Sequence, residues 1–272
     1  MRRVPPFLAI AFFLVALVAL AALLAPLIAP YDPVAQSVLQ RLKGPGALHW
    51  LGTDQFGRDV LSRILYGMRA SLAVSAAAVL AALLAGGTLG LVSAYFGGFA
   101  DRIIMRLMDV LFAFPVILLA IGIIAVMGPG AVTTTIAIAV VYTPIFARLL
   151  RGPALVIATS DYVLAARSIG ASHARIIAWH ILPNLASVAL VQTSLLMSTA
   201  ILVEASLSFL GLGTQPPFAS LGTMLSEGRN FLMLAPSSAI FSGAAILLIA
   251  FALNLFGDVL RDTLDPRLRG ER

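Results

Sequence analysis

The residues that could bind phosphate or attack a substrate are few in this chain. Its only lysine, Lys43, is followed by Gly44 and Pro45. A Walker A loop needs Gly-x-x-x-x-Gly-Lys followed by Ser or Thr, because the lysine and the backbone N–H groups together hold the phosphates of ATP. The chain therefore cannot bind ATP through such a loop. If it moves a solute actively, the ATPase must lie on another chain.

Metal ligands and catalytic pairs are equally scarce. The chain has no cysteine, which removes thiolate catalysis, iron–sulfur clusters and cysteine-based zinc sites. His173 and His180 are seven residues apart near one helical face, but no carboxylate neighbours them as a third ligand. Acidic residues never cluster as a catalytic pair would, and neither Gly-x-Ser-x-Gly nor His-Glu-x-x-His occurs. We expect no metal site, no cofactor in this chain and no enzyme activity.

Composition places the chain in a lipid bilayer. Of its 272 residues, 60% are hydrophobic and only 11% are charged, whereas soluble domains carry about 25% charged residues. A soluble globule could not cover its surface with so few charges. The net charge of +6 is then expected to set orientation in the membrane and not to bind nucleic acid.

Long stretches without charged residues predict the membrane spans. A bilayer core needs about 20 apolar residues in a helix, and the Gly-Pro-Gly turn at 128–130 divides the longest stretch in two. The result is an all-α polytopic membrane protein of about six transmembrane helices, at 7–29, 72–95, 103–127, 131–150, 185–210 and 237–257. The first stretch is too long for the apolar part of a signal peptide, so we expect it to remain as a membrane anchor.

The distribution of Lys and Arg predicts the orientation. With the N-terminus inside, the inner segments carry 12 basic residues and the outer segments, of similar total length, carry six. Cytoplasmic segments are enriched in basic residues. Both termini are therefore expected in the cytoplasm.

The longest inner segment, 148–184, contains local helix signals. Ser160 or Asp161 is a suitable N-cap, and Gly170 is a suitable helix stop. This pattern predicts a short helix that ends in a glycine bend on the cytoplasmic face.

A second short helix is expected after the bend, starting at Ser172 and ending before Pro183. The small Ala165 and Ala166 on the exposed turn of the first helix would let another protein approach closely. Spacing alone also permits a loop that merely links two spans.

This loop resembles that of ABC-importer permease subunits. The alanine pair Ala165-Ala166, followed by Gly170, matches the Glu-Ala-Ala-x-x-x-Gly pattern of that family, and the loop ends in a similar way at Ile181-Leu182-Pro183. The chain departs from the family at Leu164, where the family has glutamate. The departure removes a hydrogen bond or helix N-terminal charge that glutamate would supply, but it keeps the helix–glycine–helix shape.

In that family the loop forms a coupling helix that fits a cleft on the ATPase. The resemblance therefore implies a set of coupling residues, namely Asp161, Leu164, Ala165, Ala166, Ser168, Gly170, Ala171, Arg175 and Pro183.

Three further segments, 49–59, 204–213 and 254–267, resemble the shorter of the two paired permeases of dipeptide, oligopeptide and nickel importers. This resemblance implies a type I ABC importer permease fold in the inner membrane of a prokaryote. It divides the chain into an N-terminal helix with its outer segment, a transmembrane domain containing the coupling loop, and a cytoplasmic tail, at 1–68, 69–261 and 262–272. The implied partners are a paralogous permease, two ATP-binding cassette subunits that hold ATP and magnesium, and an extracytoplasmic substrate-binding protein.

Glu204 is the carboxylate that follows the longest uncharged part of its span. An ionised group inside a bilayer is costly, so such carboxylates are functional candidates. Glu204 lies about 28 Å beyond Leu185 at 1.5 Å per residue, near the outer boundary. We expect a structural carboxylate bonded to a neighbouring helix, with a pore-lining role as the alternative. Asp109 and Asp258 are expected to be structural, within reach of Arg106 and Arg261.

The outer segment before the second span contains turn and charge signals. Gly52 and Gly57 predict a turn that leads into a helix. The i, i+4 pairs Asp54/Arg58 and Asp59/Arg63 predict surface ion pairs worth roughly 0.3 kcal/mol each. The segment could be a solvated loop, a plug or a docking surface for a substrate-delivering protein.

Small residues at 86, 87, 90, 93 and 94 on the second span form a face that permits close helix packing. The sequence leaves open whether this face packs inside the bundle or against a partner permease.

Two other functions remain as alternatives. A nickel importer of the same family would be expected to show His or carboxylate clusters in its spans, and the spans contain no His and few carboxylates. A secondary transporter or channel would be expected to show inverted repeats and several buried ionisable groups, and would leave 165–183 without a role.

Overall fold

The computed structural model describes residues 6–264, and within this range all regular structure is helical. Most of the predicted C-terminal tail, 262–272, lies outside the described residues. The α-helices are α1 Pro6–Leu23, α2 Ala25–Ile28, α3 Val60–Phe96, α4 Gly98–Phe112, α5 Val116–Met127, α6 Ala131–Ala158, α7 Asp161–Ser168, α8 His173–Ile176, α9 Leu182–Phe209, α10 Leu221–Arg229 and α11 Ser237–Leu264. A short 3₁₀ turn, Val38–Gln40, and a π-helical turn, Ile177–Ile181, complete the set.

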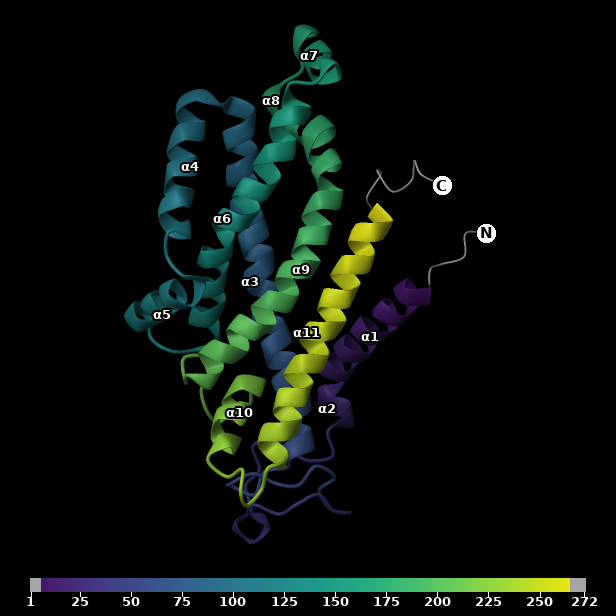
Figure 1. The fold of residues 1–272 in the computed structure, drawn as a ribbon, viewed down its shortest axis with the longest axis vertical. Helices are drawn as coiled ribbons and strands as arrows, with labels where there is room; N and C mark the ends of the chain where they lie inside the picture. The colour runs from purple at the N-terminus through teal and green to yellow at the C-terminus, as the bar shows by residue number, and fades with distance from the viewer. Residues whose placement is uncertain (1–5, 265–272) are drawn as a thin grey trace.

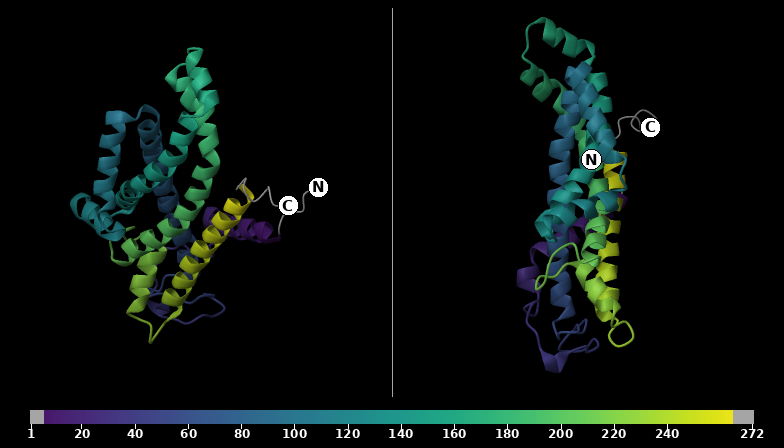
Figure 2. Two further views of the ribbon diagram at one scale, coloured as in Figure 1. Left: turned by 45° about the horizontal axis from the view of Figure 1, so that its top comes forward. Right: turned by 90° about the vertical axis from the view of Figure 1, so that its left-hand side faces the viewer.

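The helices form an elongated bundle with a different structure at each end (Figure 1). The segment α7–α8 projects from one end, and α10 lies with the irregular segment 29–59 at the other. The α4–α5 pair flanks one side, and α1 with α2 flanks the opposite side. Figure 2 shows that the bundle is narrow when seen edge-on and that α7 overhangs it.

Four helical runs are long and apolar enough to cross a bilayer, namely α3, α6, α11 and the continuous run His173–Phe209. The pair α4–α5 is a fifth candidate, but its two helices are bent by 92°. The predicted straight span at 103–127 is therefore corrected to a broken one. The first predicted span, 7–29, corresponds to α1 and α2, which together cover 6–28.

The break between α4 and α5 occurs at Pro115. This residue has φ −57° and ψ 133° and is the N-cap of α5. Proline has no N–H to donate into a preceding helix, and it pushes the residue before it, Phe114, away from helical geometry. Residues 110–127 on both sides of this proline are uncharged, so hydropathy gave no sign of this change in direction.

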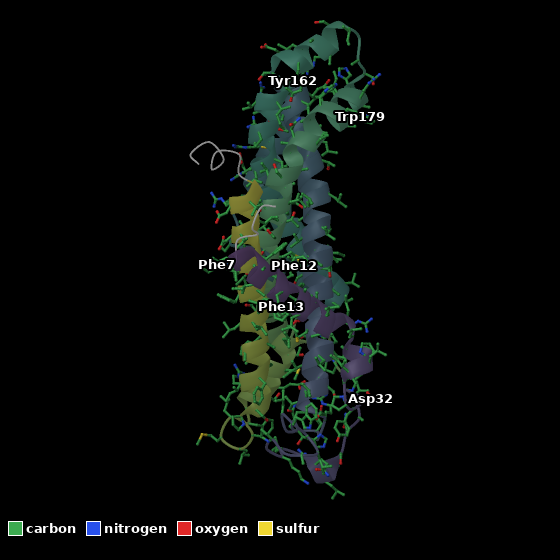
Figure 3. The ribbon with its side chains drawn as sticks, turned by 90° about the vertical axis from the view of Figure 1, so that its right-hand side faces the viewer. Phe7, Phe12, Phe13, Asp32, Tyr162 and Trp179 are labelled. Atoms are coloured by element: carbon green, nitrogen blue, oxygen red, sulfur yellow. The ribbon has the colours of Figure 1, made fainter. Side chains whose placement is uncertain are left out.

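One face of α1 points away from the bundle. Phe7, Phe12 and Phe13 on this helix are exposed, as Figure 3 shows, whereas Val18 and Ala22 are buried against α3 and α11. Large exposed apolar side chains on a helix of this composition suit contact with lipid tails. By length, however, the described part of α1 is a shorter apolar helix, Ala9–Leu23, and not one of the helices long enough to cross a bilayer, so the anchor at 7–29 stays a prediction.

The close contact between α3 and α6 explains the small residues of α3. A Cβ atom on Gly86 would collide with the carbonyl oxygen of Thr143, and one on Gly90 would collide with that of Ala147. The two backbones can approach this closely only because both positions are glycine. The small face therefore packs inside the bundle, which resolves the alternative that the sequence left open.

Candidate functional site

The projecting segment begins as the sequence predicts. The helix α7 starts after Ser160 and ends at Ser168. Gly170 follows with φ +82°, the left-handed conformation that favours glycine. The N–H of Gly170 donates to the Arg167 carbonyl at 3.0 Å, and the N–H of Ala171 donates to the Ala166 carbonyl at 3.1 Å. This pair of bonds is a Schellman motif, which closes the helix and fixes the bend.

The helix α7 is packed onto the bundle through one face. Val163, Ala166 and Ile176 are buried in one apolar cluster with Leu150 of α6 and Leu185 of α9. The prediction that Ala165 and Ala166 share an exposed turn is therefore half wrong. Ala165 is exposed, but Ala166 faces inward, because positions three apart on this helix share the face that Val163 buries.

Polar contacts also tie the segment to the end of α3. The guanidinium of Arg167 lies 4.7 Å from the centre of the Tyr95 ring, a cation–π geometry. The hydroxyl of the same tyrosine lies 2.7 Å from Nδ1 of His173. Together with the apolar cluster, these contacts join α7 and α8 to α3, α6 and α9.

Large apolar side chains occupy the outer surface of the projection. Ile169 is 86% exposed and Trp179 is 76% exposed, and Tyr162 and Leu164 are about half exposed. Figure 3 shows Tyr162 and Trp179 at the tip of the bundle. Exposed apolar side chains grouped in this way mark a surface that contacts another protein or a membrane. Of these four, only Leu164 is among the predicted coupling residues. Tyr162, Ile169 and Trp179 could have been found from the sequence, because they are large apolar residues in a segment predicted to lie outside the bilayer.

The second half of the loop differs from the prediction. A helix starts after Ser172, whose hydroxyl accepts a bond from the Arg175 N–H, but it does not end before Pro183. It continues through the π-helical turn into α9. Proline fits there because it stands at the start of α9, and the side-chain amide of Asn184 donates to the His180 carbonyl at 2.7 Å.

The remaining predicted coupling residues lie on the same projection. Asp161 is exposed in the first turn of α7, where a negative charge is favourable. The Ser168 hydroxyl donates to the Leu164 carbonyl at 3.0 Å within the helix. Arg175 is exposed on α8.

The opposite end of the bundle contains a buried ion cluster. Nε of Arg58 lies 2.5 Å from Asp54, and Nη2 lies 2.9 Å from Glu227 on α10. Arg63 lies 3.4 Å from Asp54 and 3.5 Å from Glu227. The first predicted pair exists but is buried, and the predicted pair Asp59/Arg63 is wrong. Asp54, Arg58 and Arg63 are buried, and the side chain of Glu227 is 26% exposed, so these are not surface pairs. Removing one partner would leave a buried charge uncompensated.

Asp59 has a different role from the one predicted. Its Oδ2 accepts bonds of 2.8 Å from both the N–H and the hydroxyl of Ser62, so it caps α3. Its Oδ1 lies 2.9 Å from Nδ1 of His49. Gly52 and Gly57 have φ +80° and +73° and form the predicted turn. Because the cap is at Asp59, α3 begins at Val60, twelve residues before the predicted span.

Glu204 is buried between α3 and α9, with 1% of its surface exposed. Its Oε1 accepts a 2.7 Å bond from the hydroxyl of Ser208, which lies one turn further along the same helix. The predicted bond to a neighbouring helix is thus replaced by a bond within α9, although Ser71 of α3 faces the same carboxyl group.

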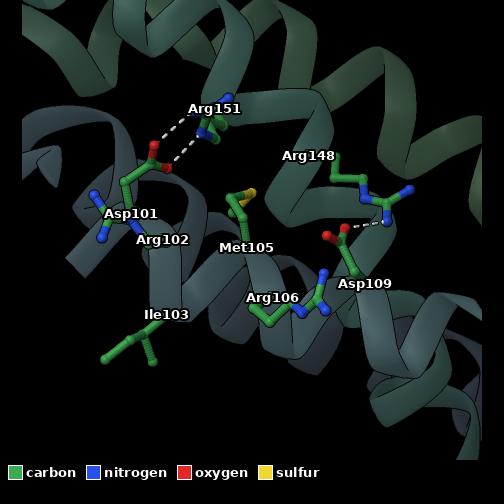
Figure 4. Close-up of a pocket in the computed structure, with 8 residues that line it drawn as sticks. All are labelled: Asp101, Arg102, Ile103, Met105, Arg106, Asp109, Arg148 and Arg151. Carbon is green, nitrogen blue, oxygen red and sulfur yellow. Dashed lines mark hydrogen bonds and ion pairs between the residues drawn. The ribbon is translucent and has the colours of Figure 1, made fainter. Parts of the chain in front are cut away.

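Two ion pairs join α4 to α6 near the end that carries α7. Asp101 accepts two bonds of 2.7 Å from Arg151, and Asp109 accepts one of 2.6 Å from Arg148 (Figure 4). Arg106, the predicted partner of Asp109, is not bonded to it. Asp258 is exposed on α11.

Comparison with known proteins identifies the class of this chain. Residues 86–270 match the family described as "Binding-protein-dependent transport system inner membrane component". The chain belongs to this family of ABC-transporter permeases.

Relatives of known name cover nearly the whole chain. It is 49% identical over 241 residues to the glutathione transport system permease protein GsiD of Pectobacterium atrosepticum, with 88% of this chain and 80% of the relative covered. It is 45% identical over 250 residues to the dipeptide transport system permease protein DppC of Alkalihalophilus pseudofirmus, with 92% and 82% covered. The probable D,D-dipeptide transport system permease protein DdpC of Escherichia coli is 42% identical, with 95% and 87% covered.

Solved structures show the same fold. A chain of the MetNI methionine ABC transporter, in an inward-facing conformation, superposes with a TM-score of 0.59 at 16% identity, over 75% of this chain and 96% of that one. A chain of an amino acid ABC transporter gives a TM-score of 0.56 at 17% identity, over 74% and 94%. The predicted type I importer permease fold is confirmed, and the chain is a multi-pass inner-membrane permease subunit.

Proposed function

We propose that this chain is one of the two permease subunits of an ATP-driven importer of dipeptides or short peptides. The names of the dipeptide and glutathione permeases, at 42–49% identity over most of the chain, support peptides as the cargo. The other half of the pore is a paralogous permease. An extracytoplasmic binding protein delivers the substrate, and two ATPase subunits lie on the cytoplasmic side.

The observation that carries this proposal is the projecting segment α7–α8. Its tip is apolar and exposed, while its base is fixed to α3, α6 and α9 by the buried cluster and by the contacts of Tyr95. Such a projection can insert into a cleft on an ATPase and move as one body with the three helices. Closure of the ATPase pair would then reorient the spans, which is alternating access.

ATP hydrolysis, which drives transport, takes place on the partner ATPase subunits. Lys43 has no Walker A context, so ATP and magnesium are bound by the ATPase subunits. This chain forms half of the translocation path and transmits the movement of the ATPase to the membrane helices. Both termini lie in the cytoplasm, and α10 with the segment 29–59 faces the outside, where the binding protein docks.

Reconstitution tests this function. Proteoliposomes that contain this chain, the partner permease and the ATPase subunits should take up a labelled dipeptide when the binding protein is outside and ATP is inside. The same liposomes without the ATPase subunits are the control. Purified alone, this chain should not hydrolyse ATP. Hydrolysis by the isolated chain, or dipeptide uptake without the ATPase subunits, would contradict the proposal.

A further inference from the structure

An open cavity of about 840 Å³, lined mainly by charged residues, lies between α4 and α6 (Figure 4). Sites for small molecules usually have volumes of about 300–1,000 Å³. Four arginines and two aspartates line this cavity, with Met105 between them. None of these residues lies on the projecting segment α7–α8.

The cavity lies near the inner boundary of the bilayer. Seventeen residues separate Ala131, at the start of α6, from Arg148. At 1.5 Å per residue the distance is about 26 Å, close to the thickness of a bilayer core of about 30 Å. Charged side chains at this depth face either a water-filled cavity or the headgroup region, and they often mark a substrate path.

Both aspartates of the cavity already have arginine partners. Asp101 is held by Arg151 through two bonds and also accepts a bond from the Ser93 hydroxyl. Asp109 is bonded to Arg148 through Oδ1, and its side chain remains 53% exposed. Two of the four arginines are thereby neutralised.

The other two arginines have no acidic partner among residues 6–264. Arg102 and Arg106 are exposed and stand four residues apart on α4, so their side chains lie on neighbouring turns of one helix face. Two like charges at this spacing repel one another. A bound anion would relieve that repulsion, and the planar guanidinium fork matches a carboxylate.

The same cavity also offers a negative group. The exposed Asp109 is seven residues from Arg102, a rise of about 10 Å along α4. A peptide of two or three residues spans about 7–10 Å when extended. Its two charged ends would therefore meet groups of opposite sign. Oδ2 of Asp109 is not used in its pair with Arg148, so it can accept a bond from the ammonium group of a peptide, which phosphatidylglycerol lacks.

We propose that Arg102 and Arg106 form a subsite for the terminal carboxylate of the transported peptide in the inner half of the path, with Asp109 facing its ammonium end. This inference rests on the proposed function, because it takes a peptide as the cargo.

The absence of cysteine from the chain permits a direct test of the charge in the cavity. In Met105→Cys, measured in the complete transporter without nucleotide, an anionic methanethiosulfonate reagent should react roughly five-fold faster than a cationic one, the size of an interaction between unit charges at about 4 Å in water. Adding Arg102→Gln and Arg106→Gln should remove this preference. The lysine pair, Arg102→Lys with Arg106→Lys, should keep it. Ala47→Cys, on the outer segment, is the control whose labelling none of these changes should affect.

Protection by ligand then identifies the occupant. Dialanine or trialanine at millimolar concentration should slow labelling of Met105→Cys several-fold, whereas the C-terminal amides should not. The lysine pair should reduce this protection, because lysine lacks the fork. The result should be the same in nanodiscs of phosphatidylcholine and in nanodiscs that contain phosphatidylglycerol.

Three results would overturn the subsite: no preference between the reagents, equal protection by the peptides and their amides, or protection by phosphatidylglycerol alone. Uptake of dialanine by the wild-type transporter is the separate readout of the proposed function. If uptake occurs without protection, the subsite alone fails. If wild-type uptake is absent for every peptide tried, the proposed function fails.

Discussion

Arg58 of the outer segment is bonded at 2.9 Å to Glu227 of α10, a residue 169 positions later in the chain. The same guanidinium is bonded to Asp54 at 2.5 Å. These contacts join the irregular segment 29–59 to α10, at the end of the bundle opposite α7. A cluster of mostly buried charges thus holds this segment against the helices, although the segment itself contains little regular structure.

Removing Arg58 should therefore destabilise the protein. In Arg58→Met, Asp54 and Glu227 lose their closest cationic partner while Asp54 stays buried. Breaking a buried ion pair typically costs about 3–5 kcal/mol. Thermal unfolding of the purified complex in detergent should show a lower Tm than the wild type. Arg69→Met is the matched control, because Arg69 is exposed, and surface changes usually stay within about 0.5 kcal/mol. Equal Tm values for the two variants would show that the ion cluster does not stabilise the protein.

The contact between α3 and α6 should not tolerate a methyl group. In Gly90→Ala the new Cβ would collide with the Ala147 carbonyl, so the helices must separate. Overpacking of this kind costs about 1–3 kcal/mol. Gly122→Ala on α5 is the control, because no atom lies within 4 Å of its added Cβ. Expression and Tm should fall for the first variant alone, and an equal fall in both would contradict the packing account.

Reporter fusions test the orientation of the chain. Fusions after Arg229 and after Arg269 should report opposite sides of the membrane, because α11 separates them and has the length and composition of a span. The second fusion should report the cytoplasm, as the excess of basic residues on that side predicts. Two fusions on the same side would contradict the topology.

Bulk on the exposed face of α7 should prevent docking of the ATPase. Ala165→Trp places a large side chain on the surface of α7 without disturbing the buried face that holds Ala166. The ATPase subunits should then dissociate during purification, and uptake should be lost. Ala47→Trp, an exposed position on the segment 29–59 at the other end of the bundle, should retain the ATPase. Leu164→Glu should also be tolerated, because this side chain is half exposed and the permease loop that the segment resembles has glutamate at this position. Normal ATPase binding by Ala165→Trp would place the docking surface elsewhere.

Local signals explain which features the sequence predicts well. The start of α7 and the bend at Gly170 depend on capping and on a positive φ, which are properties of a few consecutive residues. The turn at Gly52 and Gly57 was predictable for the same reason. Hydropathy located the spans because it sums over about 20 residues.

Features that depend on distant residues could not be predicted in this way. Spacing suggested a pair between Asp59 and Arg63, but burial and the approach of Glu227 decide the partners. The break at Pro115 lies inside a uniformly apolar stretch, so hydropathy does not show that the helix axis changes direction there. The inward position of Ala166 depends on the packing of α7 against α6 and α9.

The coupling role of the α7–α8 projection is tested most directly by replacing Gly170 with valine and measuring uptake and ATP hydrolysis together in proteoliposomes. The residue has φ +82° and open space around it, so valine strains the backbone bend without a clash. Gly211→Val is the matched control, because Gly211 also has φ +82° and open space, at the outer end of α9. Gly170→Val should lose uptake, with the ATPase either dissociated or hydrolysing ATP without transport, while Gly211→Val should keep the two activities coupled. Normal uptake by Gly170→Val with the ATPase bound would contradict the assignment of this projection as the coupling element.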